Sequence, residues 1–404
     1  MTDCQHEPAR TVDQTRDAPP STRRGRRGRG RRLTPRGRML RTGVLTVLVL
    51  FAGWLAFSVG GALTAPGTDS TAARLAEWAR THHLGFVVTS LEQAQYAMNK
   101  PSTGGTVAGG IPTIGPASGP KTTPSSRRQK IAAPPAPIKP LAPSSLAREG
   151  QWQNLYSVKG GTAARVALLR PDTVHTSYLV NVVWMDPHLV KFKLLQGYQV
   201  PGGKQVAPNK LAGADLNNVL ATFNSGFQMV DANGGYWQNG TTIKPLVKGA
   251  ASMTMTKDGH LSVGAWPGGA PGKYVAAVRQ NLRLMVQGGK ISPLVTNPSR
   301  SVWGKTVGNA SFVWRSGIGV RKDGTVVFVL GPAMDVQTLA NVLQHAGAIN
   351  AMELDINPDW TNYLTYTHPV AGKAVPQRLG NDSRPSLVRY LSPSTRDFVG
   401  VFGR

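Results

Sequence analysis

The chain has 404 residues and a mass of 43.1 kDa, more than one ordinary domain needs. Its 46 lysines and arginines outnumber 20 acidic residues, so the formal net charge is +26 and anionic partners are expected. The single cysteine, Cys4, excludes a disulfide-stapled scaffold and a multi-cysteine zinc site. With 46 glycines and 30 prolines, long stretches of the chain are not helical.

The N-terminal region joins a basic tail to an uncharged apolar segment. Residues 1–42 contain twelve arginines, and residues 43–65 contain no charge. As a helix, those 23 residues would span roughly 34 Å, enough to cross a hydrocarbon core of about 30 Å. A removable signal peptide has a shorter apolar region and a small-residue cleavage site, which residues 62–65 match poorly. We therefore expect a retained single transmembrane helix in the cell membrane, with a cytoplasmic N-terminus and the remaining chain extracellular.

The arginine and glycine run at residues 23–32 has two interpretations. Segments of this composition can bind nucleic acid. Beside a membrane span, however, basic residues also set the orientation and contact anionic lipid head groups. We expect membrane lipids to be the partner of this tail, and no nucleic acid.

Two segments separate the apolar run from the rest of the chain. Residues 66–100 predict a short membrane-proximal helical region, because the apolar residues of 71–80 share one helical face. Residues 91–98 predict a second helix there. Residues 101–150 contain 28 Pro, Gly, Ser or Thr and no aromatic residue, a composition typical of a disordered linker. Its excess of basic residues suits passage through an anionic cell wall, although a neutral tether would serve equally.

Residues 151–404 predict the globular extracytoplasmic domain, with 25 basic residues against 12 acidic ones. The pairs Asp258-Gly259 and Asp323-Gly324 each divide two strand-like runs and predict hairpins. Asp335 predicts the cap of one clear helix, and a strand over 349–356 follows it. These elements predict an α+β fold, a mixed β-sheet domain with few helices, preceded by the single transmembrane helix and the disordered linker.

Two groups in this domain could bind a ligand. Asn224 and Gly226 follow a strand-like run, where an amide side chain and an open backbone would contact a ligand or form a plain turn. Arg315 opens one of the hairpins, where its guanidinium would hold a phosphate with two hydrogen bonds or simply lie in solvent.

A third group is carboxylate-rich. Glu353 and Asp355 lie two apart on the predicted strand and so share one face, where two like charges are costly unless exposed or functional. Paired carboxylates can act as acid and base at a glycosidic centre, with Asp359 as a further partner. A divalent cation at Asp355 and Asp359 is an equal alternative, and the metal and any other cofactor stay unknown at this stage.

In this order the motifs resemble the phosphodiester glycosidase family, over roughly residues 160–370. That family includes the N-acetylglucosamine-1-phosphodiester alpha-N-acetylglucosaminidase that uncovers mannose 6-phosphate. Asn224, Gly226 and Phe227 match its Asn-Gly-Gly-Phe motif, with a serine in place of one glycine. Further matches are the Arg-x-x-x-Gly element at Arg315 and Gly319 and the helix residues Thr338, Leu339, Leu343 and Gly347. The whole chain is similar to a membrane-anchored actinobacterial version.

One departure from the family stands at the carboxylates. The family typically has Leu-Asp-Gly-Gly-Gly-Ser, whereas residues 354–359 are Leu-Asp-Ile-Asn-Pro-Asp. Asp355 is kept, but the glycines are lost and Pro358 has no amide N–H to offer an anion. The fold is expected to carry over, and this loop is where the activity would differ.

The resemblance implies an enzyme that hydrolyses a sugar-phosphodiester linkage in a cell-envelope glycan or glycolipid. Asp355 would act as acid or base or hold a cation, with Glu353 or Asp359 as its partner. Asn224 and Gly226 would orient the sugar, and Arg315 would hold the phosphate. The expected partners are membrane lipids and anionic or phosphorylated glycans. Two alternatives stay open: a non-catalytic module that binds anionic wall glycans, and a structural membrane protein.

Overall fold

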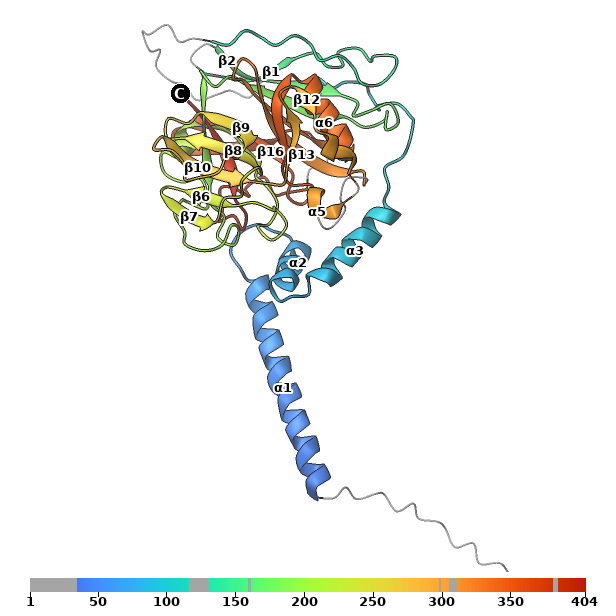
Figure 1. Cartoon of the computed structure of the whole chain (residues 1–404), viewed down its shortest axis with the longest axis vertical. Coiled ribbons are helices and arrows are strands. Elements are labelled where there is room, and N and C mark those ends of the chain that lie inside the picture. Colours follow the sequence, from blue (N-terminus) through green and yellow to red (C-terminus); the bar gives the residue numbers. More distant parts are fainter. Residues whose placement is uncertain (1–34, 116–130, 159–160, 298, 305–310, 381–383) are drawn as a thin grey trace, which may run out of the picture. The chain divides into compact units, whose positions relative to one another are not determined.

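The structure is a computed structural model of the chain (Figure 1), and it describes residues 35–115, 131–158, 161–297, 299–304, 311–380 and 384–404. By its internal contacts the chain divides into two units, residues 1–58 and residues 59–404. The arginine run at 23–32 and most of the predicted cytoplasmic tail lie outside the described residues.

The first helix, α1 (Pro35–Leu63), contains the predicted apolar segment. Its stretch Met39–Leu63 has 25 residues and a mean hydropathy of 2.1, and none of the most apolar part is buried in the protein. This stretch is long and apolar enough to cross a membrane. The helix begins before the uncharged run, so it includes Arg36 and Arg41.

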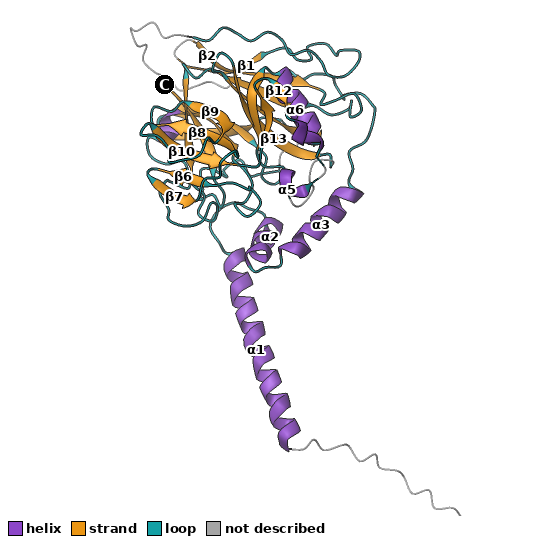
Figure 2. Ribbon diagram, viewed as in Figure 1, coloured by secondary structure: helices purple, strands orange, loops and turns teal. Residues whose placement is uncertain are grey.

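Two shorter helices follow, α2 (Thr71–Thr81) and α3 (Gly85–Met98), as Figure 2 shows. The Ser70 hydroxyl caps α2 by accepting a hydrogen bond of 3.2 Å from the Ala73 N–H. Both helices were predicted, but α3 begins six residues earlier than expected. They belong to the same unit as the globular domain, and α2 contacts it through the buried ion pair of Glu77 with Arg396.

The predicted linker differs from the expectation. Its described parts, 101–115 and 131–150, contain no helix or strand, yet they lie against the domain. Ile111 and Ile138 are buried, and the backbone N–H of Gly150 donates to the carbonyl of Leu168 at 2.8 Å. A disordered spacer is therefore wrong for these residues, because scattered apolar side chains in a Pro-rich segment insert into the domain surface. Residues 116–130 lie outside the described part of the chain.

The domain is built on three antiparallel sheets, which confirms a sheet-rich fold with few helices. The largest has eight strands in the order β1 (Gln153–Val158), β2 (Gly161–Leu169), β3 (Val180–Met185), β14 (Val326–Met334), β13 (Val313–Arg321), β15 (Ala348–Glu353), β11 (Leu284–Gln287) and β12 (Lys290–Ile291).

The other two sheets have five strands each. One has the order β7 (Thr241–Lys244), β6 (Tyr236–Gln238), β10 (Val275–Gln280), β8 (Ala251–Thr256) and β9 (Leu261–Ala265). The other has the order β17 (Lys373–Arg378), β16 (Tyr363–Val370), β5 (Val219–Asn224), β18 (Phe398–Gly403) and β4 (Val190–Leu195). Both predicted hairpins are present, as β8–β9 and β13–β14.

The large sheet is buried on both faces. Along β3, Val183 and Met185 point into one apolar cluster, while Val182 and Trp184 point into another, as the two-residue period of a strand requires. The second cluster lies under helix α6 (Val336–His345), whose buried face includes Leu343. The remaining helices are single turns, α4 (Asp215–Asn218), η1 (Pro293–Thr296) and α5 (Arg300–Trp303).

Helix α6 has the predicted ends. The Asp335 carboxylate accepts from the Thr338 N–H at 2.7 Å, and Gly347 has a positive φ of 89° just beyond the helix. The helix lies close to β13 at Gly317, where a Cβ would come within 2.9 Å of the Leu343 side chain. The hairpin is thereby held in place, with Arg315 and Ser316 directed to the strand ends that carry the predicted site.

Candidate functional site

The predicted motifs meet where β5, β13 and β15 end. Strand β15 stops at Glu353, and the chain continues between Ser316 of β13 and Ser225 after β5. The Asp355 N–H donates to the Ser225 carbonyl at 3.1 Å, and the Ser316 N–H donates to the Asp355 carbonyl at 3.0 Å. The Ser316 hydroxyl donates a second hydrogen bond to that carbonyl, at 2.8 Å. The backbone of Asp355 is therefore fixed from both sides.

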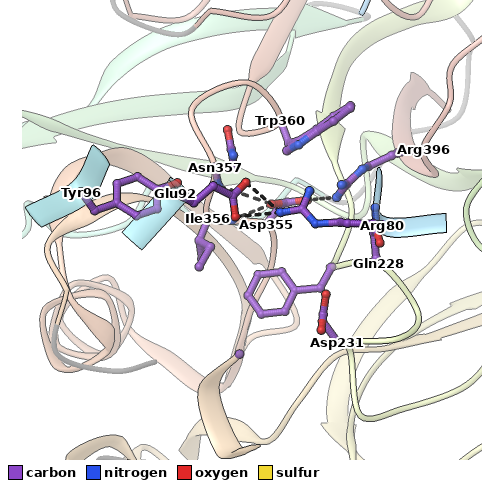
Figure 3. Close-up of a pocket in the computed structure, with 12 residues that line it drawn as sticks. Arg80, Glu92, Tyr96, Gln228, Asp231, Asp355, Ile356, Asn357, Trp360 and Arg396 are labelled. Carbon is purple, nitrogen blue, oxygen red and sulfur yellow. Dashed lines mark hydrogen bonds and ion pairs between the residues drawn. The ribbon is translucent and has the colours of Figure 1, made fainter. Parts of the chain in front are cut away.

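The Asp355 carboxylate is buried but fully paired (Figure 3). One oxygen, Oδ2, accepts from Nη1 of Arg396 at 2.7 Å, and Oδ1 accepts from the Ile356 N–H at 2.8 Å. Burial raises the pKa of Asp355, and the nearby Arg396 guanidinium opposes that rise. The result is a carboxylate of increased basicity held in a defined orientation.

Arg396 connects this carboxylate to helix α2. Its Nη2 pairs with Glu77 of α2, which also accepts a hydrogen bond from the side chain of Gln228. The guanidinium lies 3.9 Å from the ring centre of Trp360, within the range of a cation–π contact. One arginine therefore bridges two carboxylates and stacks on an aromatic ring, although the three come from separate parts of the sequence.

The Asp355 carboxylate lines a cavity of about 60 Å³. Ligand pockets usually hold about 300–1,000 Å³, so the cavity is too small for a sugar ring in this state. Helices α2 and α3 close one side of it, where Arg80 donates to both carboxylate oxygens of Glu92 at 2.7 Å. Figure 3 shows the other main lining residues, Tyr96, Gln228, Asp231, Ile356, Asn357, Trp360 and Arg396.

Asn224 and Gly226 lie beside Asp355 but do not line the cavity. The Asn224 amide donates to the Ser316 hydroxyl at 2.8 Å, and its oxygen accepts from the Asn362 N–H at 3.0 Å. A Cβ at Gly226 would come within 2.9 Å of the Asn281 side chain, so this position requires glycine for packing. Both residues hold the strand ends in place behind Asp355.

Arg315 and Glu353 form a second pair that is sealed from solvent. Nη1 of Arg315 pairs with Oε1 of Glu353, and its Nε donates to the Met334 carbonyl at 2.8 Å. Burial raises the pKa of Glu353 to about 7, against the opposing effect of Arg315. Arg315 does not line the cavity, and its guanidinium pairs with Glu353. The structure therefore does not place Arg315 where it could make the predicted contact with a phosphate.

The predicted common face of Glu353 and Asp355 is also wrong. The strand ends at Glu353, so the alternation of side chains does not continue to Asp355. Asp359 lies further out, with its side chain one-third exposed and 3.8 Å from Arg384.

The carboxylates do not make a cation site. Among the described residues, no three His, Cys, Asp or Glu side chains gather closely enough to hold a metal ion. Asp355 and Asp359 each face an arginine, whose positive charge opposes a second cation.

The sequence did not indicate several residues of this cavity. Arg396 was one of several arginines in a C-terminal segment without a motif, and Arg80, Glu92 and Tyr96 lay in a region that predicted only helices.

The three-sheet fold and its arginine-paired carboxylates define a sheet-rich domain with a small polar pocket. Residues 217–359 match the family model of the phosphodiester glycosidases, so this segment is similar to that family. No curated protein sequence matches the chain.

Solved structures offer a more distant likeness. The catalytic domain of zebrafish N-acetylglucosamine-1-phosphodiester alpha-N-acetylglucosaminidase, auto-inhibited by its pro-peptide, is 16% identical with a TM-score of 0.40, over 63% of this chain and 88% of that one. A hypothetical protein from Synechocystis is 13% identical with a TM-score of 0.33, over 60% of this chain and 62% of that one.

Proposed function

We propose that the protein is a membrane-anchored phosphodiester glycosidase that hydrolyses the bond between a sugar and a phosphate ester. The supporting observation is Asp355, a buried and oriented carboxylate that lines a polar cavity within the matched segment 217–359. Glu353, sealed behind it, and Asp359, one-third exposed, are positioned less well for the reaction.

In the proposed reaction, a water molecule attacks the anomeric carbon of the sugar. Asp355 accepts one proton from that water, and burial raises its pKa, which makes the carboxylate a stronger base. The anomeric C–O bond breaks, and its electron pair leaves with the phosphate oxygen. The leaving group is a phosphomonoester anion, so little general-acid help is needed.

Arg396 and Arg80 replace Arg315 as the proposed phosphate ligands, because both line the cavity. A planar guanidinium suits two parallel hydrogen bonds to phosphate oxygens. The cavity must widen to admit a sugar ring, and the side chains that narrow it on one side belong to α2 and α3. A small displacement of this helix pair would open the site.

The proposal places the protein in the cell membrane as a single-pass protein. Helix α1 would span the bilayer, the arginine-rich N-terminus would lie in the cytoplasm, and the domain would lie outside. The substrate would then be a phosphorylated glycan or glycolipid of the cell envelope.

A non-catalytic module that binds anionic glycans is the second candidate. The loss of the family's glycines in the loop after Asp355, together with the 25 basic against 12 acidic residues of 151–404, favours binding without turnover.

The experiment uses the full chain in detergent with methyl esters of N-acetylglucosamine-, glucose- and mannose-1-phosphate, and it measures released sugar. We expect turnover of at least one ester, and Asp355→Asn should lower kcat/KM by about 10²–10⁴. Asp359→Asn, a carboxylate outside the cavity, is the matched control and should stay within about threefold.

Two other outcomes have definite meanings. No turnover by the wild type, with salt-sensitive binding of the esters, would support the binding module. Full activity in Asp355→Asn would show that another group is the base.

A further inference from the structure

An apolar groove adjoins the polar cavity. It holds about 380 Å³, within the usual range for ligand pockets, and runs between α2, α3 and the loop that carries Pro358. Most of its lining is aliphatic, with Leu75, Ala76, Val88 and Leu91 among its residues. Such a surface favours an apolar ligand over a sugar.

The groove and the cavity are continuous. They share five lining residues, which are Arg80, Glu92, Tyr96, Asn357 and Trp360. One ligand could therefore occupy both, with its apolar part in the groove and its polar part beside Asp355.

Cationic side chains mark the boundary between the two. Arg80 lines both spaces, Arg396 lines the cavity, and Arg384, with its side chain 59% exposed, lines the groove. A phosphate between an apolar chain and a sugar would lie among these three guanidinium groups.

The groove also lies close to the end of the apolar helix. Nη1 of Arg74 on α2 donates to the carbonyl of Leu63, the last residue of α1, at 3.1 Å. Three residues later on the same helix, Glu77 holds Arg396, which holds Asp355. Three residues correspond to about 4.5 Å along a helix, so the site stays near the end of α1.

Helix α3 exposes apolar side chains. Its single charged residue is Glu92, and the side chains of Phe86 and Leu91 are 69% and 66% exposed. An apolar face of this kind favours contact with lipid or with the apolar part of a ligand.

We propose that the substrate is a lipid-linked sugar-1-phosphate, held with its lipid chain in the α2–α3 groove, its phosphate among the arginines and its sugar at Asp355. This inference rests on the proposed function and names its substrate class. Hydrolysis with water releases the free sugar and leaves the lipid monophosphate in the membrane. Neither Arg80 nor the groove-lining residues of α2 and α3 belong to the matched segment, so this specificity comes from the membrane-proximal part of the chain.

The test compares two esters of one sugar-1-phosphate, methyl and hexadecyl, with the full chain in vesicles of a neutral phospholipid. We expect the wild type to hydrolyse the hexadecyl ester with a kcat/KM at least tenfold higher than that for the methyl ester. Leu91→Glu, which places a charge in the groove at an exposed position, should remove that preference by lowering kcat/KM for the hexadecyl ester much more than that for the methyl ester. Met98→Glu is the matched control, since Met98 is an exposed apolar residue of the same helix outside the groove.

Binding of a fluorescent hexadecyl ester is measured in parallel. Equal kcat/KM for the two esters, or equal effects of Leu91→Glu on both, would overturn the proposal that the groove binds a lipid chain. The proposed glycosidase activity would be unaffected by that result. If the wild type hydrolyses neither ester, the proposed glycosidase activity is wrong. The binding measurement then tests the lipid groove by itself. Binding weakened at least tenfold by Leu91→Glu supports it, and binding unchanged by that variant overturns it.

Discussion

Two carboxylates that are two residues apart in the sequence, Glu353 and Asp355, each pair with an arginine. The two pairs differ in whether a ligand can reach them. The pair of Glu353 and Arg315 has no exposed side-chain surface, whereas Asp355 and Arg396 form part of a cavity wall. The inner pair uses one contact between its members and leaves Oε2 of Glu353 buried without a hydrogen-bond partner among the described residues. In the outer pair both carboxylate oxygens of Asp355 accept hydrogen bonds, and Arg396 also reaches helix α2 through Glu77, although its Nε has no hydrogen-bond partner among the described residues.

The comparison separates stability from chemistry. A buried ion pair contributes little net stability as a pair, but it is costly to break because one charge is then left alone. The inner pair has no route to a substrate, so its loss should affect folding. The outer pair contacts the cavity, so its loss should affect turnover first.

The largest expected effect is on folding. Arg315→Met removes the cation beside Glu353 and should lower the free energy of unfolding by about 3–5 kcal/mol. Denaturant unfolding followed by tryptophan fluorescence measures it. The double variant Arg315→Met, Glu353→Met should recover part of the loss, since no buried charge then stays unpaired. Arg384→Met, at an exposed surface pair, is the control and should change stability by less than about 1 kcal/mol.

The second prediction concerns pH. Burial raises the pKa of Glu353 to about 7 from an ordinary value of 4.5. Between these two values the folded chain keeps a proton that the unfolded chain has lost, so stability falls as pH rises. The contribution is fully present below pH 4.5 and is lost above about pH 7, with a total on the order of 3 kcal/mol.

Glu353→Gln removes this titration and is the direct check. Its stability should change less with pH than that of the wild type across this interval, in unfolding curves recorded at several pH values. An unchanged slope would show that Glu353 is already ionised at low pH in the folded protein. The outer carboxylate cannot be tested in the same way, because Asp355 also titrates in the reaction.

Local patterns in the sequence predicted the framework of this site. The Asp-Gly turns, the Asp335 cap and the strand before Glu353 each depend on neighbouring residues, and each is present. The exact end of that strand could not be predicted, and it decides whether Asp355 shares a face with Glu353. Element boundaries depend on tertiary packing, here on the hydrogen bonds from Ser316.

The partners of Asp355 could not be predicted for a different reason. Arg396 is 41 residues away and Glu77 is 278 residues away from it, and no spacing rule connects such positions. The prediction of a disordered linker was wrong for a similar reason. Its composition indicated disorder, but Ile111 and Ile138 are buried against the domain. Family resemblance indicated Asp355 but not the side chains around it, several of which lie outside the matched segment.

The third prediction probes the outer pair. Arg396 uses separate nitrogens for Asp355 and Glu77, and a lysine cannot reproduce that planar fork. Arg396→Lys should lower kcat/KM for the methyl esters by about 10–100-fold. Weaker pairing should raise the pKa of Asp355 further, so the acidic limb of the pH–rate profile should move to higher pH. A stability loss as large as that of Arg315→Met, with an unshifted profile, would make the outer pair structural too.

The smallest expected effect comes from Trp360, which is expected to position Arg396 without contacting the reacting groups. Trp360 supports the Arg396 guanidinium by a stacking contact of 3.9 Å, which is worth about 0.5–2 kcal/mol. Trp360→Leu should therefore lower kcat/KM by about 2–30-fold, and Trp237→Leu, on β6 outside the cavity, should not.

If Trp360 acts through Arg396, the two effects cannot be independent. In a double-mutant cycle, Trp360→Leu should cost less in the Arg396→Lys background than in the wild type, because the stacked guanidinium is already absent. Strict additivity of the two free energies would mean that Trp360 contacts the substrate directly. Arg396 would then be oriented by Glu77 and Asp355 alone, and helix α2 would be the main external support of the outer pair.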